Sequence, residues 1–316
     1  MRILIGYDGS ECAAAALEDL QNAGLPKTAE ALVISVADVF LPTPINEEVD
    51  DTFPLKVPRG VRLAHERAAR KLEQAGSYAE QASGRLKAIF PDWRIDHDTL
   101  AESPAWALIW RAGKWKADLV VVGAEGHSFL GGRLILGSVS QRVAYEASCS
   151  VRISRGRRRE PDWPLKLVIG VDGSHDSLAS IDAVCRRQWA DGTQVHLVVA
   201  VDTVMAIAPD PAQPSLTKWI EVGETEDWDQ VRQVFAPLTK TLRAAGLSAE
   251  VIVRKGNPKD EIVDEAASWG ADCIFIGARG TRGAERFLLG SVSSAVSARA
   301  HCSVEIVRPK VAPSLA

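Results

Sequence analysis

Short, almost uninterrupted apolar runs alternate along the chain with longer alanine-rich or amphipathic segments. An apolar run of this length, bounded by turn residues, is typical of a strand buried on both faces of a parallel sheet. Because parallel strands need right-handed crossovers, the segments between the runs are expected to be helices that cover both faces of the sheet. In the first half, the predicted strands lie within residues 3–10, 31–39, 94–100, 118–122 and 136–155.

The second half of the chain repeats this pattern. Residues 167–174 copy the first strand and its turn, Asp-Gly-Ser, at a distance of 164 residues, and residues 195–202 copy the second strand at the same distance. Residues 136–155 and 289–308 align without a gap and are identical at 12 of 20 positions. Such similarity indicates an internal duplication. The sequence therefore predicts an α/β protein with two tandem open five-stranded parallel sheets, each in the strand order 3-2-1-4-5.

The repeat also predicts the domain boundaries. We expect a first domain at 1–155, a linker at 156–163 and a second domain at 164–310. The arginine-rich linker suggests either a nucleic-acid arm or a solvated connection, and its short length favours the solvated connection. Each domain also contains a proline-rich connection, at 41–60 and 206–217, which excludes regular helix and central strand.

Composition narrows the classes of partner. The net charge of −4 gives no general attraction to nucleic acid or to an anionic membrane, and no apolar run approaches the length of a membrane helix. Met1 is followed at once by a predicted strand, so no signal peptide is expected. The five cysteines form no C-x-x-C pair, which favours small buried side chains in a reducing compartment over metal or redox chemistry. These features predict a soluble, cytoplasmic protein without nucleic-acid or membrane partners.

Candidate chemistry gathers at the carboxyl ends of the predicted strands, where ligands bind in open parallel sheets. Asp8 and Asp172 end the first strands, and Asp38 and Asp202 end the second strands. The fourth strand of the second half runs into a glycine loop with the spacing G-x2-G-x9-G-S, followed by a predicted helix. Such a loop brings backbone N–H groups and a positive helix end to a phosphate. The alternative is that the glycines only make tight turns and the aspartates only cap helices.

Three motifs together resemble the universal stress protein family: Asp-Gly-Ser after the first strand, Gly-Asn-Pro before the third helix, and the glycine spacing followed by Val-Ser. The resemblance implies an adenine nucleotide α-hydrolase-like fold and dimerisation, often through the last strand. It implies that the two halves form an intramolecular pseudo-dimer, with or without a further homodimer. The family's ATP-binding branch implies ATP, with or without Mg²⁺, bound in the second half by Asp172, Ala200, Gly277, Gly280, Gly290, Ser291, Val292 and Ser293.

The first half departs from this pattern. Its glycine loop is one residue longer, and Glu125 stands where the second half has Arg279. A carboxylate there would repel phosphate oxygens by about 1 kcal/mol in water and by more in a partly dry site. A weaker first site remains open, because the resemblance still matches Asp8, Val36, Gly123, Gly126, Gly137 and Ser138.

No residue stands out as a catalytic group. The chain has no P-loop, its glycine loops contain no lysine, and its six histidines form no metal-binding pair. The expected function is therefore an ATP-binding regulatory or sensing module with at most slow ATP hydrolysis. The rival hypothesis is a stress-response scaffold that acts through protein contacts without binding nucleotide.

Overall fold

The computed structural model describes residues 1–39, 59–125, 136–156, 163–201, 204–207, 218–221, 228–280 and 289–309. The first half alternates strands and helices throughout, as the hydrophobic pattern predicts. A single 3-10 turn at Leu20–Asn22 follows its first helix. The elements are β1 (Arg2–Gly6), α1 (Glu11–Asp19), β2 (Glu30–Ala37), α2 (Arg59–Ile89), β3 (Arg94–Ala101), α3 (Pro104–Trp115), β4 (Leu119–Gly123), α4 (Ser138–Glu146) and β5 (Ser150–Ser154).

The second half repeats this order and adds a small hairpin. The hairpin joins β8 (Val204–Ile207) to β9 (Lys218–Glu221) in antiparallel pairing, apart from the main sheet, and the sequence pattern did not reveal it. The other elements are β6 (Lys166–Gly170), α5 (His175–Cys185), β7 (Gln194–Val201), α6 (Trp228–Ala244), β10 (Ser248–Lys255), α7 (Pro258–Trp269), β11 (Cys273–Gly277), α8 (Ser291–Arg299) and β12 (Ser303–Val307).

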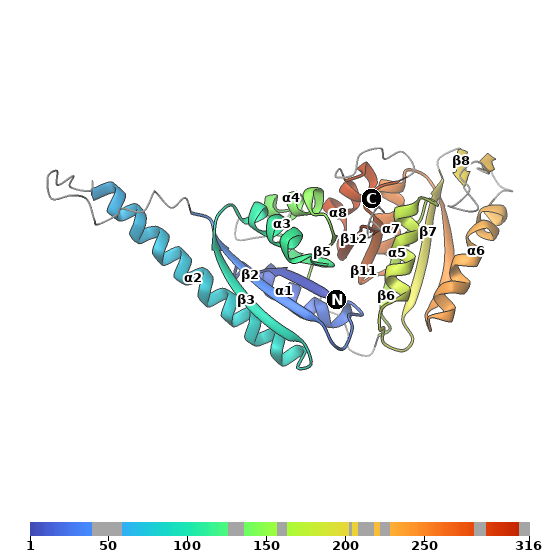
Figure 1. Ribbon diagram of the computed structural model, residues 1–316. Helices are drawn as coiled ribbons and strands as arrows, with labels where there is room; N and C mark the ends of the chain where they lie inside the picture. The colour runs from blue at the N-terminus through green and yellow to red at the C-terminus, as the bar shows by residue number, and fades with distance from the viewer. Residues whose placement is uncertain are drawn as a thin grey trace, which may run out of the picture.

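The ten main strands form one sheet in the order β10-β7-β6-β11-β12-β5-β4-β1-β2-β3. Within each half the pairings of this sheet are all parallel, which confirms the α/β fold class. The two five-stranded sheets join into one, because β12 pairs with β5 in antiparallel register, which agrees with the pseudo-dimer expected of the two halves. An unpaired edge strand exposes a row of N–H and C=O groups, and joining the two edges satisfies both rows. Figure 1 shows the first half, blue to green, beside the second half, yellow to red.

The core lies in layers on both faces of this sheet. Alternate residues of β1 point to opposite faces, so Ile3 and Ile5 join a cluster with α1 and α2, while Leu4 joins the cluster under α3 and α4. That second cluster continues under α7 and α8 and includes Val304 and Ile306 of β12, so one core spans both halves. On the opposite face the second half has its own cluster under α5 and α6. The halves therefore share a core on one face of the sheet.

The structure describes only part of the predicted linker at 156–163. Gly156, the first residue of the predicted linker, packs against α1, since a Cβ on it would collide with Ala15. The rest of the predicted linker, apart from Trp163, lies outside the described residues, so its boundaries stay a prediction.

All five cysteines have free thiols. Among the helices of the described ranges, none is long and apolar enough to cross a membrane.

Candidate nucleotide site

The turn after β6 is built by Asp172, Gly173 and Ser174. The Asp172 carboxylate accepts hydrogen bonds at Oδ1 from the Ser174 N–H (3.0 Å) and the Ser174 hydroxyl (2.6 Å). Gly173 takes a φ of +79°, which favours glycine. Ser174 caps α5, because its Oγ accepts from the Ser177 N–H at 3.3 Å. The serine is thus the helix cap, and the aspartate shapes the turn that presents it.

The same carboxylate reaches the glycine loop from the adjacent strand. A Cβ placed on Gly280 would lie 2.8 Å from Asp172 Oδ2, so a side chain there would press on the carboxylate. Strands β6 and β11 are neighbours in the sheet, so their carboxyl ends bring the turn and the loop together. Two predicted site residues separated by more than a hundred positions therefore meet at one edge of the sheet.

Gly277 has a packing role at the end of β11. A Cβ on it would lie 2.6 Å from the Asp176 carbonyl carbon and 2.7 Å from the Ser177 nitrogen, both backbone atoms of α5. Gly123 lies in the same way against α1, where the closest backbone atom, of Cys12, would be 3.2 Å away. For these two glycines, the alternative of a structural role has direct support, because each lets a helix approach a strand end closely.

The start of α8 supplies the helix end expected for phosphate. Gly290 is the N-cap residue, and within the described residues no side chain caps this helix. The Gly290 N–H donates to the Ala278 carbonyl at 2.8 Å, and the buried Ser293 hydroxyl donates to the same carbonyl at 2.8 Å. Ser291 is exposed at the first helical position. The Ser293 hydroxyl therefore holds the loop in place, while Ser291 is exposed at the start of the helix.

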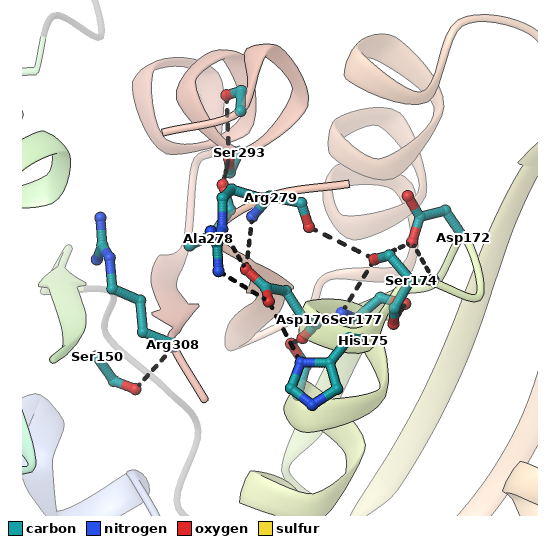
Figure 2. A network of polar contacts seen from close by, with 12 residues as sticks. Ser150, Asp172, Ser174, His175, Asp176, Ser177, Ala278, Arg279, Ser293 and Arg308 are labelled. Atoms are coloured by element: carbon teal, nitrogen blue, oxygen red, sulfur yellow. Dashed lines mark hydrogen bonds and ion pairs between the residues drawn. The ribbon is translucent and has the colours of Figure 1, made fainter. Parts of the chain in front are cut away.

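Arg279 lies between these features and is held by Asp176 in the first turn of α5. The Asp176 carboxylate is buried and accepts from the Arg279 backbone N–H (3.2 Å) and Nε (3.1 Å) at Oδ2 and from Nη2 (3.4 Å) at Oδ1. Figure 2 shows the guanidinium pointing at this carboxylate. The pair ties the beginning of the glycine loop to α5, which the sequence did not predict.

The first half reproduces the turn and the helix start. Asp8 Oδ1 accepts from Ser10 N–H (3.0 Å) and hydroxyl (2.6 Å), as Asp172 does from Ser174. Gly137 caps α4 and donates to the Ala124 carbonyl at 2.8 Å, and Ser138 is exposed at its first position. Gly126 lies outside the described residues. The strand-1 turn and the helix N-cap thus have the same hydrogen bonds in the two halves, whereas the Ser140 hydroxyl donates to the Gly123 carbonyl and not to that of Ala124.

The surroundings of the first turn are different. The Tyr78 ring of α2 lies over Gly9, so close that a Cβ on Gly9 would be 2.5 Å from the ring. No described residue lies within 4 Å of a Cβ placed on the equivalent Gly173. The position of Asp176 is taken by Cys12, beside Glu125. Burial, and after it the charge of Glu125, raises the pKa of the Cys12 thiol. The first half therefore replaces the ion pair of the second half with a neutral thiol near a carboxylate.

The remaining predicted residues lie on neighbouring strand ends. Ala200 is near the carboxyl end of β7 and Val36 near that of β2, each half-buried and adjacent to the strand-1 turn. Val292 follows Ser291 in the first turn of α8 and is half-buried. Asp38 follows β2, and Asp202 lies outside the described residues. The carboxyl ends of strands 1, 2 and 4 thus assemble in each half.

Two residues that define these sites were missed. Asp176 was detectable as an acidic residue in the first turn of a helix, next to the Asp-Gly-Ser turn. Tyr78 was not detectable, because its contact depends on where α2 crosses the turn. In the described ranges, no group of three or more His, Cys, Asp or Glu side chains is placed to hold a metal ion.

Comparison with known proteins identifies relatives of both halves. The model of the universal stress protein family matches residues 1–155 and 165–308. A universal stress protein of Mycolicibacterium smegmatis is 28% identical over 313 residues, covering 98% of this chain and 97% of its own. The universal stress protein YxiE of Bacillus subtilis is 29% identical over 150 residues, 45% of this chain and 98% of its own. The crystal structure of a universal stress protein from Archaeoglobus fulgidus superposes with a TM-score of 0.63 at 16% identity, covering 97% of this chain and 98% of that one.

Proposed function

Because the chain belongs to the universal stress protein family, we propose that its second half binds ATP and that the protein is a stress-response regulatory or sensing module. The observation that carries the proposal is the approach of the Asp172 carboxylate to Gly280, beside the uncapped start of α8. A carboxylate suits ribose hydroxyls, and a helix N-terminus suits phosphates. A nucleotide carries both kinds of group on one molecule.

Each residue would have a distinct task. The N–H groups of Ser291, Val292 and Ser293 and the Ser291 hydroxyl would hold phosphate oxygens, while Asp172 Oδ2 would accept from the ribose. The backbone near Ala200 would meet the adenine. With no metal-binding cluster in the described residues, Mg²⁺ would enter with the phosphates. A helix dipole binds phosphate without activating water, so any hydrolysis would be slow.

Two other expectations belong to the same proposal. The five free thiols suit a reducing compartment, which supports a cytoplasmic location. The domain division at 1–155 and 164–310 is supported by the placement of β5 and β6 on either side of the predicted linker.

Calorimetric titration with ATP and Mg²⁺ tests the binding site. Wild type should bind with a stoichiometry of about one, since only the second turn is uncovered among the described residues. Gly280→Val should weaken binding roughly 100-fold, a loss of about 3 kcal/mol. The valine would push the carboxylate aside.

The matched control is Gly126→Val at the equivalent position of the first loop. It should leave the affinity within a factor of about two, well below 1 kcal/mol. A flat wild-type titration, from protein shown by denaturation and chromatography to carry no co-purified nucleotide, would rule out the proposal. Equal losses in the two variants would place binding elsewhere.

The scaffold hypothesis has a specific observation in its favour for the first half. Tyr78 covers the turn, and Glu125 places a carboxylate beside the loop. If the cover alone prevents binding there, Tyr78→Ala should raise the ATP stoichiometry from about one toward two. An unchanged stoichiometry would mean that more than the Tyr78 ring, such as the Glu125 carboxylate, keeps nucleotide out of the first half.

A further inference from the structure

The seam between β5 and β12 is held on both sides by the same contact. The Arg155 N–H donates to Ser303 Oγ at 3.0 Å, and its Nη2 donates to the Ser297 carbonyl of α8 at 2.6 Å. Arg308, which occupies the equivalent repeat position, does the same to Ser150 Oγ (3.1 Å) and the Ala144 carbonyl of α4 (2.5 Å). Each arginine thus caps the last helix of the other half. Contacts of this kind are self-complementary and would hold any two halves together, whichever they were.

The centre of the seam is different. The register pairs Val304 with Ile153, Glu305 with Arg152, and Ile306 with Val151. Arg152 and Glu305 are equivalent positions of the repeat, so the pseudo-two-fold axis passes through this pair. Every other pair across the seam has a symmetry mate, and only this one pairs a position with its own equivalent. Two copies of the same half would therefore place arginine against arginine or glutamate against glutamate.

Both side chains at the axis are fully enclosed. The Arg152 and Glu305 side chains are each 1% exposed, and Arg152 Nη1 lies 3.4 Å from Glu305 Oε2. Each also has a partner from its own half. Arg152 Nε donates to Asp19 Oδ2 at 2.8 Å, and Arg187 Nη2 donates to Glu305 Oε1. Arg187 also donates to the Ala23 carbonyl of the first half at 2.8 Å.

We propose that the Arg152–Glu305 pair makes the last-strand edge heterotypic, so that each half pairs with the other half of its own chain and not with its counterpart in a second chain. Like charges directly opposite each other across a strand pair are destabilising, and the penalty grows where water is excluded. The edge that would join two copies is thus used inside one chain. Any further homodimer would have to use another surface.

Charge reversal in the full-length chain tests the proposal. Arg152→Glu puts glutamate at both axis positions, and Glu305→Arg puts arginine at both, so neither variant can form a complementary seam alone or with its own copies. When the two variants are expressed together, half 1 of one chain complements half 2 of the other at both seams. Native mass spectrometry should show a 1:1 heterodimer in roughly tenfold excess or more over either homodimer.

Further variants and the wild type make every result decisive. Wild type and the uncharged pair Arg152→Met with Glu305→Met should form no dimer through this edge, because neither meets like charges there. If a single-reversal variant is insoluble alone, its recovery on co-expression supports the proposal. The proposal is overturned if co-expression yields no more heterodimer than a random mixture, or if the single-reversal variants stay monomeric with the melting temperature of the uncharged pair.

Discussion

The turn after β1 and the turn after β6 are made from the same three residues, yet their surroundings differ. Asp8 and Asp172 accept the same two hydrogen bonds at the same distances from Ser10 and Ser174. Over the first turn lies the ring of Tyr78, whereas no described residue comes within 4 Å of a Cβ on Gly173. The comparison teaches that a short motif determines its own backbone geometry, while access to it is decided by elements distant in sequence.

The two glycine loops also differ in the side chains that lie beside them. In the second half Asp176 and Arg279 form an ion pair that fixes the start of the loop. In the first half the equivalent positions are Cys12 and Glu125, and burial with the Glu125 charge raises the pKa of the thiol. The second loop is tied to the helix beneath it by a complementary pair, and the first has no such pair at these positions.

The largest difference between the halves is expected from the strand-end glycines. Gly277→Ala should lower the free energy of unfolding by about 3 kcal/mol, since the new Cβ would meet α5 backbone that cannot rotate away. Gly123→Ala should cost about 1 kcal/mol, because its nearest backbone atom is farther off. Chemical denaturation followed by tryptophan fluorescence measures both. Equal costs would show that the two helices approach their strands equally closely.

The ion pair between Asp176 and Arg279, which clamps the second glycine loop to α5, is expected to contribute less to stability than Gly277 does. Asp176→Asn should lower the free energy of unfolding by about 1.5 kcal/mol, the scale of hydrogen bonds to a charged group. The matched change Glu125→Gln in the first half should stay within about 0.5 kcal/mol. The same denaturation experiment compares them. A cost at Glu125 as large as that at Asp176 would mean that the first loop has a clamp of its own.

The smallest difference is a dependence on pH that only the second half should show. Glu265 of α7 is buried, which by itself raises its pKa, but hydrogen bonds from Arg254 and His196 outweigh burial and lower the pKa overall. A carboxyl with a lowered folded pKa stabilises the fold above its unfolded pKa of about 4.3, and this stability is lost as the pH falls through the folded value.

Glu265→Gln should therefore flatten the loss of stability below about pH 4.3, as measured by denaturation at a series of pH values. The first half has Arg111 at the equivalent position, paired with Asp98 at 3.0 Å. Arg111→Gln is the control and should leave the acid limb nearly unchanged. An equally steep acid limb in wild type and Glu265→Gln would contradict this account.

Much of the fold could be predicted from the pattern of apolar runs. The Gly-Asn-Pro motif precedes α7 as expected, and Pro258 starts that helix, because proline suits the first turn of a helix. The parallel pairing within each half also follows from apolar strands joined by helical crossovers. The β8–β9 hairpin was missed, since four-residue strands beside a proline-rich stretch carry too little pattern.

The candidate site was predicted in its residues more fully than in their roles. The meeting of Asp172 with Gly280 follows from strand order, which the repeat and the crossover rule predict. The clamp of Arg279 on Asp176 and the enclosure of the Ser293 hydroxyl did not follow, because each depends on the direction of a side chain. Whether these residues bind ATP stays a prediction that calorimetry can test.

The sequence by itself determined the two halves, their strands and the turns at their ends, because hydrophobic periodicity and turn chemistry act over a few residues. Only the tertiary structure decided the register in which the two sheets join, that Tyr78 covers one turn, and that Arg152 faces Glu305 on the pseudo-two-fold axis. The aligned repeat already contained that arginine and that glutamate as one mismatch among many. That the two residues face each other became visible only in the antiparallel register. The strength of the interaction between two charges depends on their burial and distance, and not on their spacing along the chain.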